Sequence, residues 1–134
     1  MAKRLMLGHT LLVASLVAAA EPTSVNALWN DDEGFGIWLY GRPGSCHEFA
    51  YAHPPFVVVG NGGKASAFRE ARLDAAALKV CMRATPPAVA FCTRGHLDVR
   101  YDPTNNEYVG SYDLSLSDGS VWSGPFRAQY CKSK

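Results

Sequence analysis

The sequence lacks an excess of charge of either sign. Its 134 residues include 13 Lys and Arg and 12 Asp and Glu, which gives a formal net charge of +1 at pH 7. Proteins that bind nucleic acid usually carry a clear basic excess, because they neutralise phosphates. We therefore expect no nucleic-acid partner.

The sequence also lacks the short motifs of common catalytic and metal chemistry. It contains no C-x-x-C, no H-E-x-x-H and no G-x-S-x-G, which are typical of zinc sites, metalloproteases and serine hydrolases. Asp31-Asp32-Glu33-Gly34 lacks the alternating oxygen ligands of an EF-hand calcium loop. We therefore assign no catalytic residue, no metal ligand and no cofactor, and the sequence favours a protein that is not an enzyme.

One local arrangement could still carry chemistry, namely Cys46-His47-Glu48 together with His53. These residues could form a thiolate–imidazole pair or part of a metal site. On an extended strand, however, Cys46 and His47 would point to opposite faces. We favour a disulfide for Cys46.

No apolar run is long enough to span a membrane, but a shorter one lies near the start. Lys3 and Arg4 precede the uncharged run 11–20, and small residues flank a cut before Glu21. This is the pattern of a secretory signal peptide at residues 1–20. A second cut after Ala27 is an alternative, so the mature chain would start at Glu21 or Leu28. We expect a secreted or periplasmic protein without a membrane span after cleavage, since a span needs roughly 20 apolar residues.

The rest of the chain is long enough for one domain. Residues 21–34 contain four acids and no base, which predicts an acidic flexible leader. Residues 35–134 then form a single β-rich domain.

An even number of cysteines in a small exported chain indicates two disulfides. The four are Cys46, Cys81, Cys92 and Cys131. A two-residue hairpin turn at Asp118-Gly119 and a turn near Asn105 would place Cys92 and Cys131 at opposite ends of a meander, on the order of 30 Å apart. A disulfide needs Cα atoms within about 7 Å. We therefore disfavour Cys92–Cys131 and prefer Cys81–Cys92 with Cys46–Cys131 over the remaining pairing.

The last forty residues give the clearest structural pattern. Apolar and polar residues alternate over 97–101, 108–116 and 122–130, which predicts a three-stranded antiparallel meander. The turn near Asn105 pairs residues whose numbers sum to about 209, and the tight hairpin pairs residues whose numbers sum to 237. Pro125 removes a backbone donor, so the last strand should lie at an edge or carry a bulge there.

The first half of the chain is less regular. We expect strands at residues 36–40, 56–59 and 89–91. Residues 66–82 fit both helical and alternating spacing, and we favour a helix or part-helix while a strand stays open. The predicted fold is mainly β: a small antiparallel β-barrel or sandwich with a C-terminal three-stranded meander, two disulfides, and with or without one short helix.

Aromatic residues on the predicted strands are the best functional signal. Most should pack in the core, but a few at a rim would bind a ligand or partner. The candidate binding surface consists of Trp38, Tyr40, Arg42, Tyr112 and Trp122. The connecting segment 42–55 is a further candidate surface.

Two short segments are similar to known families. Gly36-Ile37-Trp38 is similar to the glycine-x-tryptophan of the first lipocalin strand, and residues 118–124 are distantly similar to hairpins of small periplasmic lysozyme inhibitors. Each similarity covers one strand or one hairpin. We therefore carry over no residue roles and assign no family.

These observations favour an exported, small, non-catalytic binding protein of recognition or inhibitor type. Its partner would be an extracytoplasmic protein or a small ligand. The first alternative is a calycin-like carrier of a small apolar ligand, which a filled barrel interior would exclude. A small secreted hydrolase is a less favoured alternative, which requires titratable groups that meet only in three dimensions.

Overall fold

The structure is a computed structural model that describes residues 24–31, 34–52, 55–60, 70–83 and 89–132. The predicted signal peptide at 1–20, the leader residues 21–23 and 32–33, and His53 lie outside the described residues. The elements, in chain order, are β1 (Ala27–Asn30), β2 (Gly36–Leu39), α2 (Cys46–Ala52), β3 (Val57–Gly60), β4 (Glu70–Asp74), a 3-10 turn (Ala75–Ala77), β5 (Val80–Arg83), β6 (Ala90–Asp102), β7 (Glu107–Leu116) and β8 (Val121–Tyr130).

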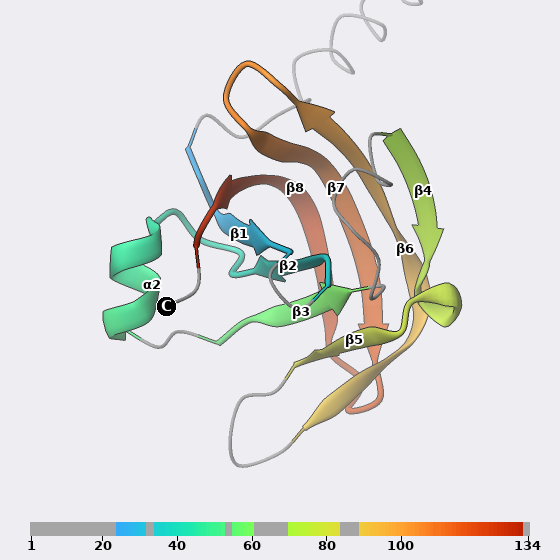
Figure 1. Ribbon diagram of the computed structural model, residues 1–134. Helices are drawn as coiled ribbons and strands as arrows, with labels where there is room; N and C mark the ends of the chain where they lie inside the picture. The colour runs from blue at the N-terminus through green and yellow to red at the C-terminus, as the bar shows by residue number, and fades with distance from the viewer. Residues whose placement is uncertain (1–23, 32–33, 53–54, 61–69, 84–88, 133–134) are drawn as a thin grey trace, which may run out of the picture.

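Seven of the strands close into a barrel (Figure 1). Their order is β6-β5-β3-β2-β1-β8-β7, and β7 pairs back onto β6. The extra strand β4 pairs with β6 beside the ring. Every described ladder is antiparallel except β1–β8, which is parallel. The prediction of a mainly β fold, with the barrel rather than the sandwich, is confirmed.

Alternating residues of the strands fill the barrel. The largest side chains that are less than 2 % exposed are Tyr108, Phe126, Ile37, Leu39, Leu97, Leu114, Val57 and Val59. Around them, the Tyr108 ring lies 5.0 Å from Trp29, 4.9 Å from Phe35 and 5.0 Å from Tyr101, measured between ring centroids. Tilted and edge-on aromatic contacts of this kind stabilise the core beyond the area they bury.

The predicted meander is confirmed, with one register correct and one shifted. Leu97 lies opposite Tyr112 in β6–β7, as the turn near Asn105 predicts. Between β7 and β8, however, Leu116 N–H donates to Ser120 O and Gly119 N–H donates to Leu116 O. The loop therefore has three residues rather than two, with Gly119 at φ 88°. This extra residue moves the β7–β8 pairing by one position from the predicted one.

The last strand is not an edge over its whole length. Residues Ala128 to Tyr130 pair with β1, so β8 is an edge only before this stretch, as predicted for the position of Pro125. Pro125 lies before that stretch, where its carbonyl accepts a hydrogen bond from the Asn26 side chain at 3.0 Å. The missing proline donor is therefore tolerated at the part of β8 that precedes the β1 pairing.

The predicted leader contains a core strand. Residues Ala27–Asn30 form β1, and Ala27, Leu28 and Trp29 are buried. The prediction of a solvated segment over 21–34 is wrong for these residues. Acidic composition averaged over the window hid an apolar tripeptide that pairs with both β2 and β8.

Strands replace the favoured helix in the described part of 66–82. Residues 66–69 lie outside the described residues, and the rest form β4, the short 3-10 turn and β5. Both strands pair with the same edge of β6, one after the other along its 13 residues. Pairing with β6 therefore decided between two patterns that the local sequence left open.

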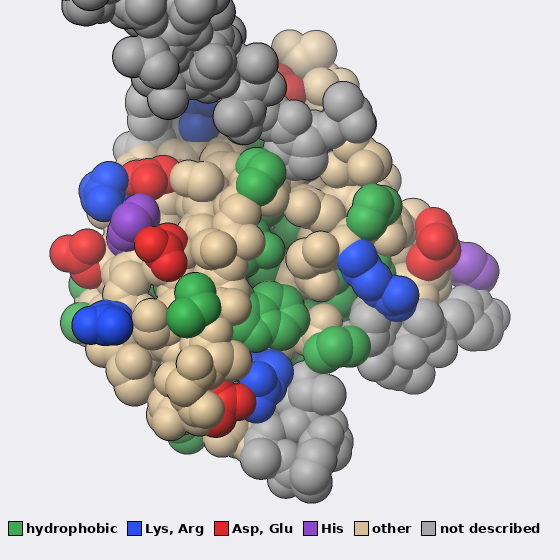
Figure 2. Space-filling view, turned by 180° about the vertical axis from the view of Figure 1, so that it is seen from behind, with side chains coloured by type: hydrophobic (Ala, Val, Ile, Leu, Met, Phe, Trp, Pro, Cys, Tyr) green, Lys and Arg blue, Asp and Glu red, His purple; other side chains and the backbone are tan. Residues whose placement is uncertain are grey.

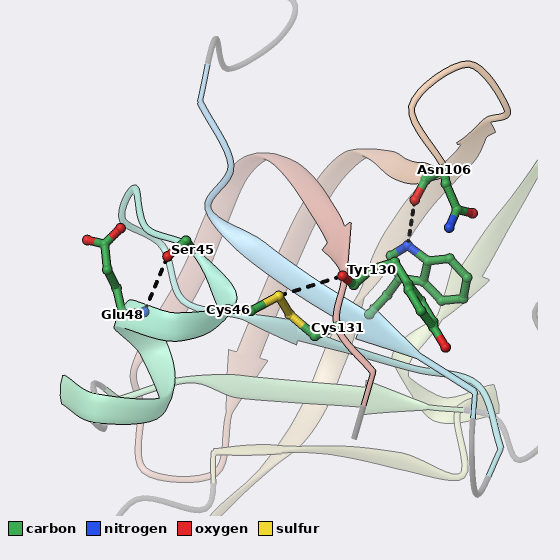
Figure 3. Close-up of a disulfide and its surroundings, with 7 residues drawn as sticks. Ser45, Cys46, Glu48, Asn106, Tyr130 and Cys131 are labelled. Carbon is green, nitrogen blue, oxygen red and sulfur yellow. Dashed lines mark hydrogen bonds between the residues drawn. A yellow bond between two sulfur atoms is a disulfide. The ribbon is translucent and has the colours of Figure 1, made fainter. Parts of the chain in front are cut away.

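The described helix α2 lies instead in the segment 42–55. Ser45 caps its start, because Ser45 Oγ accepts a hydrogen bond from the Glu48 N–H at 3.3 Å (Figure 3). Ser45 and Glu48 form the S-x-x-E spacing of a capping box. That local signal was present in the sequence and predicts this helix.

Both preferred disulfides are confirmed. Cys81 and Cys92 join β5 to β6 with Cα atoms 5.4 Å apart, and Cys46 and Cys131 join α2 to the end of β8 with Cα atoms 5.9 Å apart (Figure 3). The Cys46 sulfur also lies 3.6 Å from the Tyr130 carbonyl oxygen. This is a contact only, since a disulfide sulfur carries no proton.

Among the described residues, no helix is long and apolar enough to cross a membrane.

Candidate functional site

The structure divides the predicted binding surface into two groups. The side chains of Ile37 and Leu39 occupy the interior of the barrel. Trp38 and Tyr40 alternate with them along the chain and therefore belong to the outer side of the barrel wall. The Tyr40 ring stacks on Phe49 of α2, with centroids 3.9 Å apart and an interplanar angle of 8°. Burial raises the pKa of Tyr40. Tyr40 thus attaches α2 to the barrel and is not a free recognition residue.

Tyr112 and Trp122 lie near Gly41, in the segment that follows β2. Trp122 is the second residue of β8, and Gly41 follows the last residue of β2 by two positions. A Cβ atom on Gly41 would lie 3.7 Å from both Tyr112 Oη and Trp122 Cζ3. Gly41 has φ +73°, a value that glycine adopts without strain. We call Gly41, Tyr112 and Trp122, together with Arg42, which follows Gly41 in the chain, the mouth site.

The Tyr112 hydroxyl is the unusual group in the mouth site. Tyr112 is 5 % exposed, yet its hydroxyl has no hydrogen-bond partner among the described residues. Desolvation by burial raises its pKa. Buried tyrosine hydroxyls usually find a partner, because an unpaired polar group costs free energy. The hydroxyl therefore has hydrogen-bonding capacity that no described residue uses.

Two glycines lie near Tyr112. Gly41 approaches its hydroxyl without a side chain, and Gly124 lies directly opposite Tyr112 in the β7–β8 pairing. A Cβ atom on Gly124 would meet no heavy atom within 4 Å. The position across from Tyr112 is therefore open space where other strand residues would place a side chain.

The charged residues at this end of the barrel differ in whether they have a partner of opposite charge. Arg83 donates to Asp118 and Ser120, on the turn between β7 and β8. Hydrogen bonds from the Ser120 side chain and backbone, followed by Arg83, lower the pKa of Asp118 to about 2. Arg42 is exposed and forms no ion pair with any residue that the structure describes. Asp118 is thus paired with Arg83, whereas Arg42 has no acidic partner among the described residues.

Some apolar side chains are also exposed to solvent. Val121, next to Trp122, is 60 % exposed, and Phe91 is 58 % exposed. Figure 2 shows hydrophobic side chains gathered around a hollow on the face opposite to that of Figure 1, with Lys or Arg and Asp or Glu side chains at its border. A surface that combines exposed apolar groups with charges at their border is typical of recognition sites.

A separate depression of about 510 Å³ lies on β4, β6 and β7. It is lined by Ala71, Arg72, Asp98, Val99, Arg100, Val109 and Gly110. Arg72 and His96 both lie 3.6 Å from Asp98 carboxylate oxygens. Asp98 therefore offsets the charge of Arg72, and none of the predicted binding residues lines this depression.

The alternative chemistry at Cys46 is removed by its disulfide with Cys131. Within the described ranges, no three His, Cys, Asp or Glu side chains are grouped so that they could hold a metal ion. Comparison of the chain with protein-family models, curated proteins and solved structures gives no match.

Proposed function

We propose that this is an exported, non-catalytic binding protein of recognition or inhibitor type, and that it binds an extracytoplasmic protein at the mouth site. Export is supported by the signal-peptide pattern at residues 1–20 and by two disulfides, which persist mainly in oxidising compartments. Cleavage before Glu21 suits the fold better than cleavage before Leu28, because the second cut removes Asn26 and Ala27 from the barrel wall.

The observation that carries the binding proposal is the convergence of Gly41 on Tyr112 and Trp122. Residues distant in sequence bring together a hydroxyl and an indole ring, and the next residue after Gly41 is an arginine; neither the hydroxyl nor this arginine has a partner among the described residues. Trp, Tyr and Arg are the residues most enriched among the side chains that dominate binding energy at protein interfaces.

The same structure argues against the alternative of an apolar carrier. A carrier of this type holds its ligand inside the barrel, but Tyr108, Phe126 and Leu114 are fully buried there and pack against further aromatic rings. An exterior site is therefore the better-supported place for a partner.

The test compares the exported protein with two variants. Wild type, Trp122→Ala and Arg72→Ala are purified in the oxidised form, and equal unfolding midpoints establish that each is folded. Each is immobilised and exposed to the secreted or periplasmic proteins of the expressing cells. Proteins held by wild type are then purified, and their dissociation constants are measured by calorimetry.

We expect one partner whose affinity falls about thirtyfold or more in Trp122→Ala and is unchanged in Arg72→Ala, which lies in the separate depression. Equal affinity for wild type and Trp122→Ala, or no partner enriched by wild type over that variant, would contradict the proposal. Retention of the chain in the cytoplasm with residues 1–20 attached would contradict its export.

A further inference from the structure

The unpaired polar groups of the mouth site all act as hydrogen-bond donors. Arg42 and the Trp122 indole N–H can only donate, and a tyrosine hydroxyl donates when it is protonated. Neither Arg42, Trp122 nor Tyr112 has a hydrogen-bond partner among the described residues. Of the three, only Tyr112 is buried, since Arg42 is exposed and Trp122 is partly exposed. A ligand that engages all three groups as donors at once would have to supply acceptor atoms.

The charge balance at this end of the barrel selects an anionic acceptor. The nearby acid, Asp118, is already held by Ser120 and Arg83. Arg42 has no acid to neutralise it in the part of the chain that the structure describes. Hydrogen bonds from arginine to a carboxylate are shorter and stronger than neutral ones, and the two groups match in geometry.

Two residues without side chains lie near Tyr112. A Cβ atom on Gly41 would lie 3.7 Å from Tyr112 Oη, and Gly124 pairs with Tyr112 across β7–β8. The same Cβ atom would lie 3.7 Å from Trp122 Cζ3, so a ligand at Gly41 could contact both the hydroxyl and the apolar indole ring. Burial raises the pKa of Tyr112 above its ordinary value of 10.0, so the hydroxyl keeps its proton at neutral pH.

We propose that the mouth site is a carboxylate subsite. It accepts a carboxylate borne by the partner protein, on an Asp or Glu side chain or at a chain end, with Tyr112 and Arg42 as donors and Trp122 against its apolar stem. This inference rests on the proposed function for the source of the carboxylate. The chemistry of the subsite is testable without that partner.

The test uses two probes of nearly equal shape, 4-fluorobenzoate and 4-fluorobenzamide, each titrated with the oxidised full-length mature protein and followed by fluorine NMR. We expect 4-fluorobenzoate to bind at least ten times more tightly than the uncharged amide. Its affinity should fall about tenfold in Tyr112→Phe and in Arg42→Ala, and it should weaken as salt is added.

Arg72→Ala is the matched control, since it removes an arginine from the depression on β4, β6 and β7. We expect it to bind 4-fluorobenzoate as wild type does. Equal binding of the two probes, or benzoate binding that is lost in Arg72→Ala and kept in Arg42→Ala, would overturn the carboxylate subsite. So would full affinity in a folded Tyr112→Phe variant.

The two proposals fail separately. One outcome is that wild type binds a partner protein, Trp122→Ala does not, and wild type does not bind 4-fluorobenzoate. This outcome overturns only the carboxylate subsite. Selective binding of 4-fluorobenzoate at the mouth site, without any captured partner protein, supports the subsite and overturns the protein as its source.

Discussion

Asn26 and Arg127 are joined by two hydrogen bonds. The Arg127 N–H donates to Asn26 Oδ1 at 2.8 Å, and the Asn26 N–H donates to the Arg127 carbonyl at 3.2 Å. The Asn26 side chain also donates to the carbonyl of Pro125. These bonds lie directly before the parallel β1–β8 pairing, so Asn26 begins the contact that closes the barrel.

Asn26→Ala should destabilise the protein by about 2 kcal/mol. The variant removes two side-chain hydrogen bonds, each worth about 1 kcal/mol net. Urea unfolding of the oxidised protein measures the loss. Asn26→Asp is the control, because it keeps the acceptor for Arg127 and removes only the donor to Pro125, so it should lose less. Equal losses in the two variants would contradict this assignment.

The two disulfides should contribute unequally to stability. Cys46–Cys131 joins residues 85 positions apart and Cys81–Cys92 joins residues 11 apart. Loop-closure entropy predicts losses of about 4.6 kcal/mol and about 2.8 kcal/mol when each pair is replaced by alanines. Denaturant unfolding of the two double variants tests the order. A larger loss on removing Cys81–Cys92 would show that native-state effects outweigh chain entropy.

Acid should weaken the turn between β7 and β8. The pKa of Asp118 lies at about 2 instead of 3.8, so the folded state favours the charged carboxylate. Its stabilisation is present above about pH 4 and is lost as the pH falls through about 2. Carbon NMR of the Asp118 carboxyl group measures this titration directly.

Ser120→Ala should raise the pKa of Asp118, because the hydrogen bond from Ser120 Oγ is the largest cause of the shift. Asp118→Asn should also flatten the change of the unfolding midpoint between pH 4 and 2. A normal pKa for Asp118 in the wild type, or no change in Ser120→Ala, would count against the network.

Removing the Tyr112 hydroxyl should not destabilise the free protein. Tyr112→Phe deletes a buried polar group without a partner among the described residues, so the free energy of unfolding should stay unchanged or rise by up to about 1 kcal/mol. Tyr101→Phe is the matched control, since Tyr101 Oη donates to Asn106 Oδ1 at 2.6 Å. That variant should lose about 1 kcal/mol. A similar loss in both would indicate that Tyr112 is hydrogen-bonded in the folded protein.

The sequence by itself determined the elements whose signals are local. Alternation over residues 97–130 gave the three strands of the meander, and the turn residues before Asn106 gave the β6–β7 register. Together with the β7–β8 turn, that register argued against Cys92–Cys131, and the observed pairing was the preferred one of the two that remained. The S-x-x-E spacing at Ser45 is equally local and specifies the start of α2.

Only the tertiary structure decided the rest. Residues 27–30 and 70–83 became strands because β8 and β6 supplied partners for them, and no local window contains those partners. The mouth site arose in the same way, since Gly41, Tyr112 and Trp122 meet only after the barrel closes. Of the five predicted surface residues, the sequence could not separate Tyr40, which packs on Phe49, from Tyr112, whose hydroxyl has no partner among the described residues. Both are aromatic residues in or beside a strand, and their roles depend on what the folded chain brings next to each ring.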